Sequence, residues 1–284
     1  MTFTLHQGEN NTLFPLDEAF GILGILNVSP DSFYNNAVGK INEEAARLLA
    51  GGADILDLGA ESTRPGAKPI PASIEIERLA PAIRQLRMDF PDARISVDTW
   101  KAETAVFAIA EGACLINDVS GLLDPALPGV LAEFKPGYCL TYSYGPRGGK
   151  SADKDDIISD AKRFFEVRLK LLTAAGLPED RVMLDPGIGF GKSRSDNLAL
   201  LSRIGEFREF GRPLLAAISM KSFFGDLLGL GSRGRGEVSA VASALLWEKG
   251  VFWHRAHDPS RIRDALRLAA ALTRDCGQGK ARQV

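Results

Sequence analysis

The chain has few cysteines, few histidines and no long apolar run, and each shortage excludes a class of protein. Its 284 residues include 3 cysteines and 3 histidines. An odd number of cysteines without CxxC spacing indicates neither a disulfide framework nor a structural zinc site. No apolar run approaches the ~18 residues of a membrane span, and the start, MTFTLHQGEN, lacks the basic and apolar regions of a secretion signal. We therefore expect a cytoplasmic protein without a membrane partner.

The sequence also lacks an excess of either charge. Lys and Arg number 34 against 36 Asp and Glu, and the net charge is −2. This balance gives no sign of a nucleic-acid partner, which would call for a basic excess. What the chain has is an ordinary globular composition, with 45% hydrophobic residues, and a mild excess of glycine at 29 residues. The glycines follow no collagen period, so we expect them to mark tight turns.

Short apolar runs alternate with segments of helical periodicity. The runs predict buried parallel strands at 21–28, 54–59, 94–99, 115–119, 138–142, 182–185, 213–219 and 251–256. Helices are predicted at 43–50, 74–86, 101–110, 156–175, 238–249 and 259–272. Eight strands separated by helices predict a (β/α)₈ barrel, with residues 1–284 as one domain and a barrel core over about 21–272. A doubly wound open sheet is the alternative, because strand number alone does not prove closure.

Polar residues recur where the predicted strands end. They are Asn27, Glu61, Asp98, Asn117, Asp185, Lys221 and Arg255. The carboxyl ends of barrel strands converge on one mouth, where catalytic residues lie. Seven polar residues on seven strands are more than solvation requires, and they predict an active site at this mouth.

The segment Asp185–Ser193, DPGIGFGKS, ends like a phosphate-binding P-loop but lacks its first glycine. That position is Pro186, which argues against nucleoside triphosphate chemistry. We expect the three spaced glycines to turn the backbone sharply past a ligand.

Four further segments carry candidate binding groups. In ESTRPG, 61–66, Arg64 presents a planar cation suited to phosphate or carboxylate. In NVSPDSF, 27–33, Asn27 offers an amide oxygen to a hard cation such as Mg²⁺. In SMKSF, 219–223, Lys221 reaches the mouth as a point charge and Ser222 begins a helix. In WHRAHD, 253–258, Arg255 and His257 form a cationic pair fit for phosphate. Taken singly, each is as readily a capping or solvated group.

Together these segments resemble the dihydropteroate synthase family. The resemblance runs in order from about Leu23 to Ala270 through GILNVSPDSF, GADILDLGAESTRPGA, ISVDTWKAETA, INDVSG, LDPGIGFGKSRSDNL, ISMKSF and HRAHD. It implies a TIM barrel that joins 4-aminobenzoate to 6-hydroxymethyl-7,8-dihydropterin diphosphate and releases pyrophosphate with Mg²⁺. It also implies a homodimer with small-molecule substrates.

The resemblance assigns a role to each matching residue. The pterin site takes Asp98, Asn117, Asp185 and Lys221, and the diphosphate site takes Asn27, Arg255 and His257. Asn27 is the implied metal ligand, and Lys221, Arg255 and His257 are the implied catalytic residues. The aminobenzoate site takes Phe33, Thr63, Arg64, Pro65, Phe190 and Ser222.

Three segments depart from the family pattern. Met220 stands where the family usually has Arg, Thr141-Tyr142-Ser143-Tyr144-Gly145 replaces a segment with a His-Met pair, and the first loop reads Phe33-Tyr34-Asn35-Asn36. The missing cation keeps open a non-catalytic or altered pterin-binding paralogue. A pterin-dependent methyltransferase module is a weaker alternative, because a methyl donor has no diphosphate for Arg64, Arg255 and His257 to hold.

Overall fold

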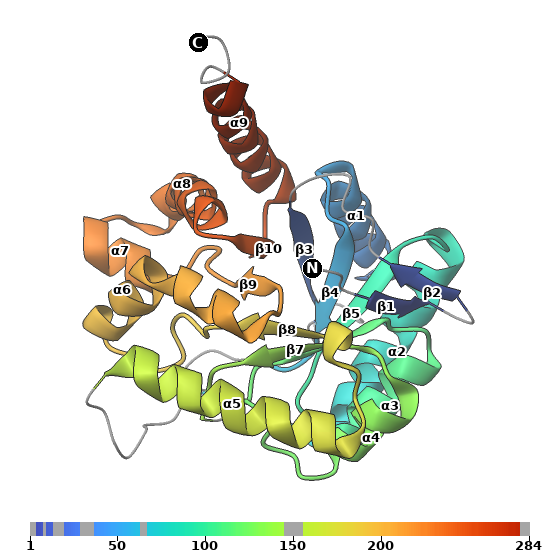
Figure 1. Ribbon diagram of the computed structural model, residues 1–284. Helices are drawn as coiled ribbons and strands as arrows, with labels where there is room; N and C mark the ends of the chain where they lie inside the picture. The colour runs from blue at the N-terminus through green and yellow to red at the C-terminus, as the bar shows by residue number, and fades with distance from the viewer. Residues whose placement is uncertain are drawn as a thin grey trace.

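The structure is a computed structural model that describes residues 4–7, 10–13, 20–28, 37–62, 67–144 and 156–278. Eight parallel strands close into a barrel in the order β10-β3-β4-β5-β6-β7-β8-β9 (Figure 1). They are β3 Gly21–Asn27, β4 Ile55–Gly59, β5 Arg94–Asp98, β6 Leu115–Asp118, β7 Gly137–Thr141, β8 Val182–Asp185, β9 Leu214–Ala216 and β10 Val251–Ala256. Each matches a predicted strand, and the pairing of β10 with β3 excludes the open sheet.

Helices follow the strands and surround the barrel. They are α1 Ala37–Ala50, α2 Ala72–Asp89, α3 Ala102–Ala110, α4 Leu127–Phe134, α5 Ile157–Ala175, α6 Arg194–Ser202, α7 Ser222–Leu228, α8 Arg235–Glu248 and α9 Pro259–Gln278, with 3₁₀ turns η2 Glu179–Arg181, η3 Ile204–Phe210 and η4 Ser232–Gly234. The six predicted helices are confirmed. Our reading missed α4, α6 and the hairpin of β1 Thr4–Gln7 with β2 Asn10–Leu13, which are too short for a clear apolar period. Of α7 it predicted only the start, at Ser222.

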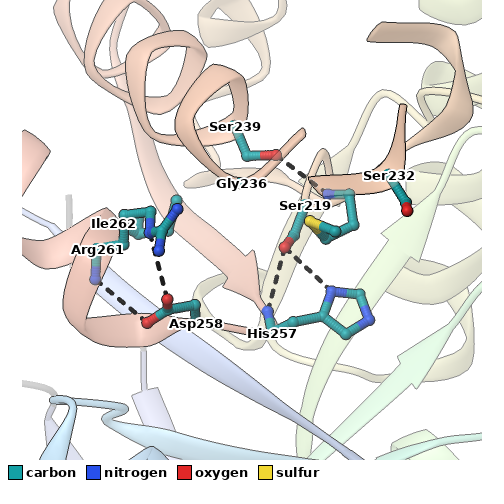
Figure 2. A pocket seen from close by; sticks show the side chains of 9 residues that line it. Ser219, Ser232, Gly236, Ser239, His257, Asp258, Arg261 and Ile262 are labelled. Carbon is teal, nitrogen blue, oxygen red and sulfur yellow. Dashed lines mark hydrogen bonds and ion pairs between the residues drawn. The ribbon is translucent and has the colours of Figure 1, made fainter. Parts of the chain in front are cut away.

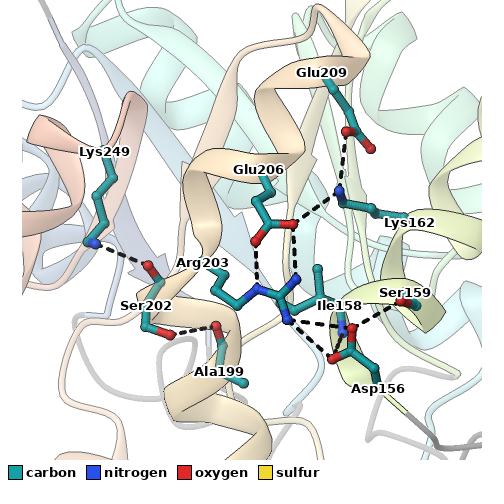
Figure 3. Close-up of polar contacts among 10 residues, drawn as sticks. All are labelled: Asp156, Ile158, Ser159, Lys162, Ala199, Ser202, Arg203, Glu206, Glu209 and Lys249. Carbon is teal, nitrogen blue, oxygen red and sulfur yellow. Dashed lines mark hydrogen bonds and ion pairs between the residues drawn. The ribbon is translucent and has the colours of Figure 1, made fainter.

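Apolar side chains pack the helices against the barrel, and polar contacts join neighbouring helical segments at the surface. Lys162 of α5 bridges Glu206 and Glu209 of η3, and Arg203 joins Glu206 to Asp156 (Figure 3). Exposed pairs of this kind contribute little to stability. Among the described residues, no helix combines the length and the apolar character that crossing a membrane requires.

Layers of inward-pointing side chains fill the barrel. Because side chains alternate between the two faces of a strand, the buried interior cluster identifies the inward face of each. That cluster includes Leu23, Ile55, Leu115, Cys139, Met183, Leu215 and Trp253. Two residues further toward the carboxyl ends, the same face of β4, β6, β8 and β10 carries Asp57, Asn117, Asp185 and Arg255. In a barrel of this kind, alternate strands supply the four members of one layer. An apolar floor thus supports a polar layer.

Candidate active site

The polar layer is held together by its own hydrogen bonds. Asp57 is fully buried, and its Oδ2 accepts from Nε of Arg255 at 2.5 Å and from Nδ2 of Asn117 at 3.0 Å. Nη2 of Arg255 donates to Oδ2 of Asp98 at 2.8 Å. One guanidinium therefore joins two carboxylates from different strands, and Asp57, which our sequence reading did not select, is the shared acceptor.

Burial and charge have opposite effects on the pKa values in this layer and at Asp98, which lies one layer nearer the mouth. Burial raises the pKa of Asp98 to about 7; Arg255 acts to lower it and Asp57 adds to the rise. Burial acts to lower the pKa of Arg255, but the two carboxylates outweigh it and raise that pKa. Burial also raises the pKa of Asp185, against hydrogen bonding by Gly187 and the charge of Lys221. The site is thus a desolvated set of acceptors with two cations, Arg255 and Lys221, in which an unpaired ligand group would be costly.

The turn after β8 packs against Lys221, which follows β9. Gly187 has a φ of 68°, and a Cβ there would overlap the carbonyl oxygen of Tyr142, so only glycine fits. Its N–H donates to Oδ1 of Asp185 at 2.8 Å. Nζ of Lys221 lies 4.7 Å from the centroid of the Phe190 ring. The predicted sharp glycine turn is therefore confirmed, and it brings these side chains to one side of the mouth.

Lys192, the lysine of the P-loop-like sequence, has a structural role. Its Nζ donates to the carbonyl oxygens of Tyr142 at 2.9 Å and Gly187 at 2.8 Å and lies 4.5 Å from the centroid of the Tyr142 ring. A lysine already bound to two carbonyl groups secures the turn. This agrees with the exclusion of a P-loop.

The rim after β9 and β10 holds His257 beside a pocket. Oγ of Ser219 lies 3.0 Å from Nδ1 of His257 and accepts from its backbone N–H at 3.1 Å. A pocket of about 500 Å³ lies between this rim and helices α8 and α9 (Figure 2). Its lining residues are Ser219, Met220, Ser232, Gly236, Ser239, His257, Asp258, Arg261 and Ile262. The pocket borders the mouth at His257 but does not include the polar layer.

A buried ion-pair network supports the loops after β4 and β5. Nζ of Lys101 donates to Oε2 of Glu61 at 2.7 Å and to Oε2 of Glu75 at 3.0 Å. Thr99 and Thr104 also donate to Glu75. Burial acts to raise the pKa of Glu61, but the Lys101 hydrogen bond helps to lower it. Glu61, predicted as a mouth residue, is thus anchored within this network.

The predicted residues fall into three groups. Asp98, Asn117, Asp185, Arg255 and Lys221 are brought together at the mouth. Asn27 is exposed at the end of β3, Ser222 begins α7 as predicted, and His257 lies on the rim. Phe33, Thr63, Arg64 and Pro65 lie outside the described residues, as does the first loop. Asp57 and Glu75 were missed; the signal for Asp57 was a carboxylate inside the apolar run DILDLG.

Comparison with known proteins agrees with this geometry. Residues 23–257 match the family model described as pterin binding enzyme. The chain is 35% identical to dihydropteroate synthase of Escherichia coli K12, covering 88% of this chain and 90% of that protein. The Streptococcus pyogenes synthase is 37% identical, with 91% and 98% covered. The solved structure of Xanthomonas albilineans dihydropteroate synthase with 4-aminobenzoic acid is 34% identical, with a TM-score of 0.86 and 96% and 99% covered. The chain therefore belongs to the dihydropteroate synthase family of pterin-binding enzymes.

Proposed function

We propose that this protein condenses 6-hydroxymethyl-7,8-dihydropterin diphosphate with 4-aminobenzoate to give 7,8-dihydropteroate and pyrophosphate in folate biosynthesis. The observation that carries the proposal is the polar layer, which gathers Asp57, Asn117, Asp185 and Arg255 at the mouth of a barrel of this family. Solved structures of Xanthomonas albilineans dihydropteroate synthase with 4-aminobenzoic acid and with 7,8-dihydropteroate support the same reaction.

The pterin is proposed to enter edge-on. Its 2-amino group and ring N3–H form a guanidine-like pair of donors, which one carboxylate accepts bidentately. Asp185 is the proposed acceptor, because it is buried on the inward face of β8 and its Oδ1 is held by the N–H of Gly187. Asn117 and Asp98 complete the edge, and Lys221 covers the ring. Binding in a desolvated layer discriminates against rings that lack these donors.

The chemical step is a displacement at the methylene carbon of the pterin. The aniline nitrogen of 4-aminobenzoate forms the new C–N bond, the C–O bond to the diphosphate breaks, and the nitrogen loses a proton to solvent. The chain contributes positioning and stabilisation of the leaving negative charge. His257 and Arg255 are the proposed diphosphate ligands. Arg255 lies in β10, and His257 follows just after the strand ends at Ala256, so a diphosphate bound by both would span from the layer to the rim.

Mg²⁺ is the proposed metal. Within the described residues no group of three or more His, Cys, Asp or Glu is placed to hold a metal ion. The donor set fits a metal carried mainly by substrate, because Mg²⁺ binds through one or two protein oxygens, phosphates and water. Asn27, exposed at the mouth, would supply one oxygen. The metal, when bound, would neutralise charge on the departing diphosphate.

We also propose a cytoplasmic homodimer. Val241 and Leu245 on α8 are 61% and 56% exposed, and Leu268 and Leu272 on α9 are 61% and 62% exposed. Each pair is four residues apart on one helix face, and apolar faces of this kind are typical of interfaces. Cys114 and Cys139 are buried as free thiols, which suits a reducing compartment. Sedimentation should give a dimer, and Leu268→Glu should give a monomer; a monomeric wild type would contradict the proposal.

The reaction is tested by measuring pyrophosphate release from pterin diphosphate and 4-aminobenzoate, with Mg²⁺ and with EDTA. We expect release that requires Mg²⁺. Asp185→Ala should abolish release and pterin binding, whereas Asp92→Ala, exposed between α2 and β5, should change neither. Absence of release despite pterin binding by calorimetry would instead identify a non-catalytic paralogue, the possibility that Met220 raises.

A further inference from the structure

Thr141 lies inside the mouth, one layer above Asp185 and Asn117. It is the last residue of β7 and the register partner of Asp185. Two residues earlier, Cys139 belongs to the interior cluster, so the side chain of Thr141 also points inward. The strands are tilted, so the layers of β3, β5, β7 and β9 alternate in height with those of the other strands. The layer nearest the mouth therefore contains Ile25, Asp98, Thr141 and Ala217.

The residue below Thr141 on β7 also lies near charges of the polar layer. The thiol of Cys139, directly below Thr141, has a raised pKa because of burial and because of the nearby charges of Asp185 and Asp57. Thr141 and Asp98 lie in one layer, directly above Asp185 and Asn117. Thr141 therefore lines the proposed pterin site.

The hydroxyl of Thr141 is buried without a partner. The residue is 0% exposed, and its Oγ1 has no hydrogen-bond partner among the described residues. Threonine is common in strands, so the residue type needs no special reason. The unpaired oxygen does, because native proteins pair nearly all of their buried polar groups. Asp185 and Asn117, the neighbouring pterin candidates, are also buried, at 2% exposure each. Of these three residues, Thr141 is the one with a buried side-chain oxygen that has no partner within the described residues, and it lies beside Asp185.

We propose that Thr141 is a further pterin-binding residue, whose hydroxyl donates a hydrogen bond to the pterin beside the donors that Asp185 accepts. This inference rests on the proposed function. The donor pair of a pterin is flanked on both sides by acceptors, N1 on one side and the C4 carbonyl oxygen on the other. A carboxylate cannot satisfy these acceptors, whereas a hydroxyl next to that carboxylate can. Thr141 and Asp185 together match three consecutive groups of the pterin edge.

The experiment compares Thr141→Val, which has the same shape without the hydroxyl, with Thr141→Ser, which keeps it. The probe is 6-hydroxymethylpterin, with binding measured by calorimetry so that turnover is not needed. We expect Thr141→Val to raise the Kd about 5- to 10-fold, which corresponds to about 1–1.4 kcal/mol, and Thr141→Ser to stay within about 2-fold. Thr141→Val should also raise the KM for pterin diphosphate while leaving the KM for 4-aminobenzoate unchanged.

A structural role would give a different result. In the free protein Thr141→Val removes no protein hydrogen bond, so its Tm should not fall. The matched control is Thr104→Val, because Thr104 is fully buried and donates to Glu75 at 2.7 Å; it should lower Tm and leave the pterin Kd unchanged. An unchanged Kd for Thr141→Val, with normal wild-type binding, would overturn this inference alone. Failure of the wild type to bind 6-hydroxymethylpterin would overturn the proposed function, and this inference with it.

Discussion

Asp57→Ala should destabilise the protein strongly, because Asp57 is the shared acceptor of the polar layer. It is fully buried, and it accepts from Arg255 and Asn117. Removing one partner of a buried ion pair costs about 3–5 kcal/mol, because the other charge stays buried. Arg255 keeps its contact with Asp98 at 2.8 Å, so we expect the lower end, about 3 kcal/mol. Asp57→Asn keeps the shape and one acceptor oxygen, and we expect it to lose about 1.5–3 kcal/mol.

The assay is urea unfolding at pH 7.5, with the free energy of unfolding compared at equal m-value. Asp92→Ala, an exposed control, should stay within about 0.5 kcal/mol of wild type. Asp57→Asn should also lower the pKa of Asp98 below its value of about 7, because the charge of Asp57 contributes to raising it; carbon NMR of the carboxyl groups measures this. If Asp57→Ala lowers the free energy of unfolding by less than about 1 kcal/mol, well below the loss expected for a buried pair, Asp57 does not hold Arg255 as we infer.

Three further predictions follow from other buried or rim residues. Burial lowers the pKa of His254 to about 3 in the folded protein. The free energy of unfolding is therefore unaffected by this residue above the histidine pKa of the unfolded chain, and it falls as the pH drops below that value. About 2 kcal/mol should be lost between pH 7.5 and 5, and His254→Gln should flatten that part of the urea-unfolding profile. Lys101→Met leaves the buried carboxylates of Glu61 and Glu75 without their cation and should lower the free energy of unfolding by about 3–5 kcal/mol. Adding Glu75→Gln should recover part of this loss, and no recovery would contradict the network. Met220→Arg restores the family cation and should raise kcat/KM for synthase turnover; an unchanged value would show that this cation is dispensable here.

The strands and the glycine turn were readable from the sequence because their causes are local. A continuous apolar run predicts a strand buried on both faces, and each of the eight predicted runs is a barrel strand. Pro186 excluded the P-loop, and Lys192 bound to two carbonyl groups agrees with that exclusion. The hairpin and the short helices α4 and α6 were missed because few residues give no clear period.

The contacts within the site were not readable in this way. Asp57 was passed over because a carboxylate inside an apolar run has no visible partner in sequence, and Arg255, 198 residues away along the chain, supplies it. Glu61 was expected at the mouth, but its carboxylate is bound to Lys101. Whether a strand-end polar group faces a ligand or a neighbouring loop depends on the packing of several elements at once.

The sequence by itself determined which residues lie at strand ends, because side-chain alternation and apolar periodicity are properties of single segments. It therefore predicted that Asp98, Asn117, Asp185 and Arg255 share one mouth. Only the tertiary structure decided their heights within it, because layers depend on strand tilt and register around a closed barrel. That stagger pairs Asp57 with Arg255 and Asn117, and it places the unpaired hydroxyl of Thr141 one layer above Asp185.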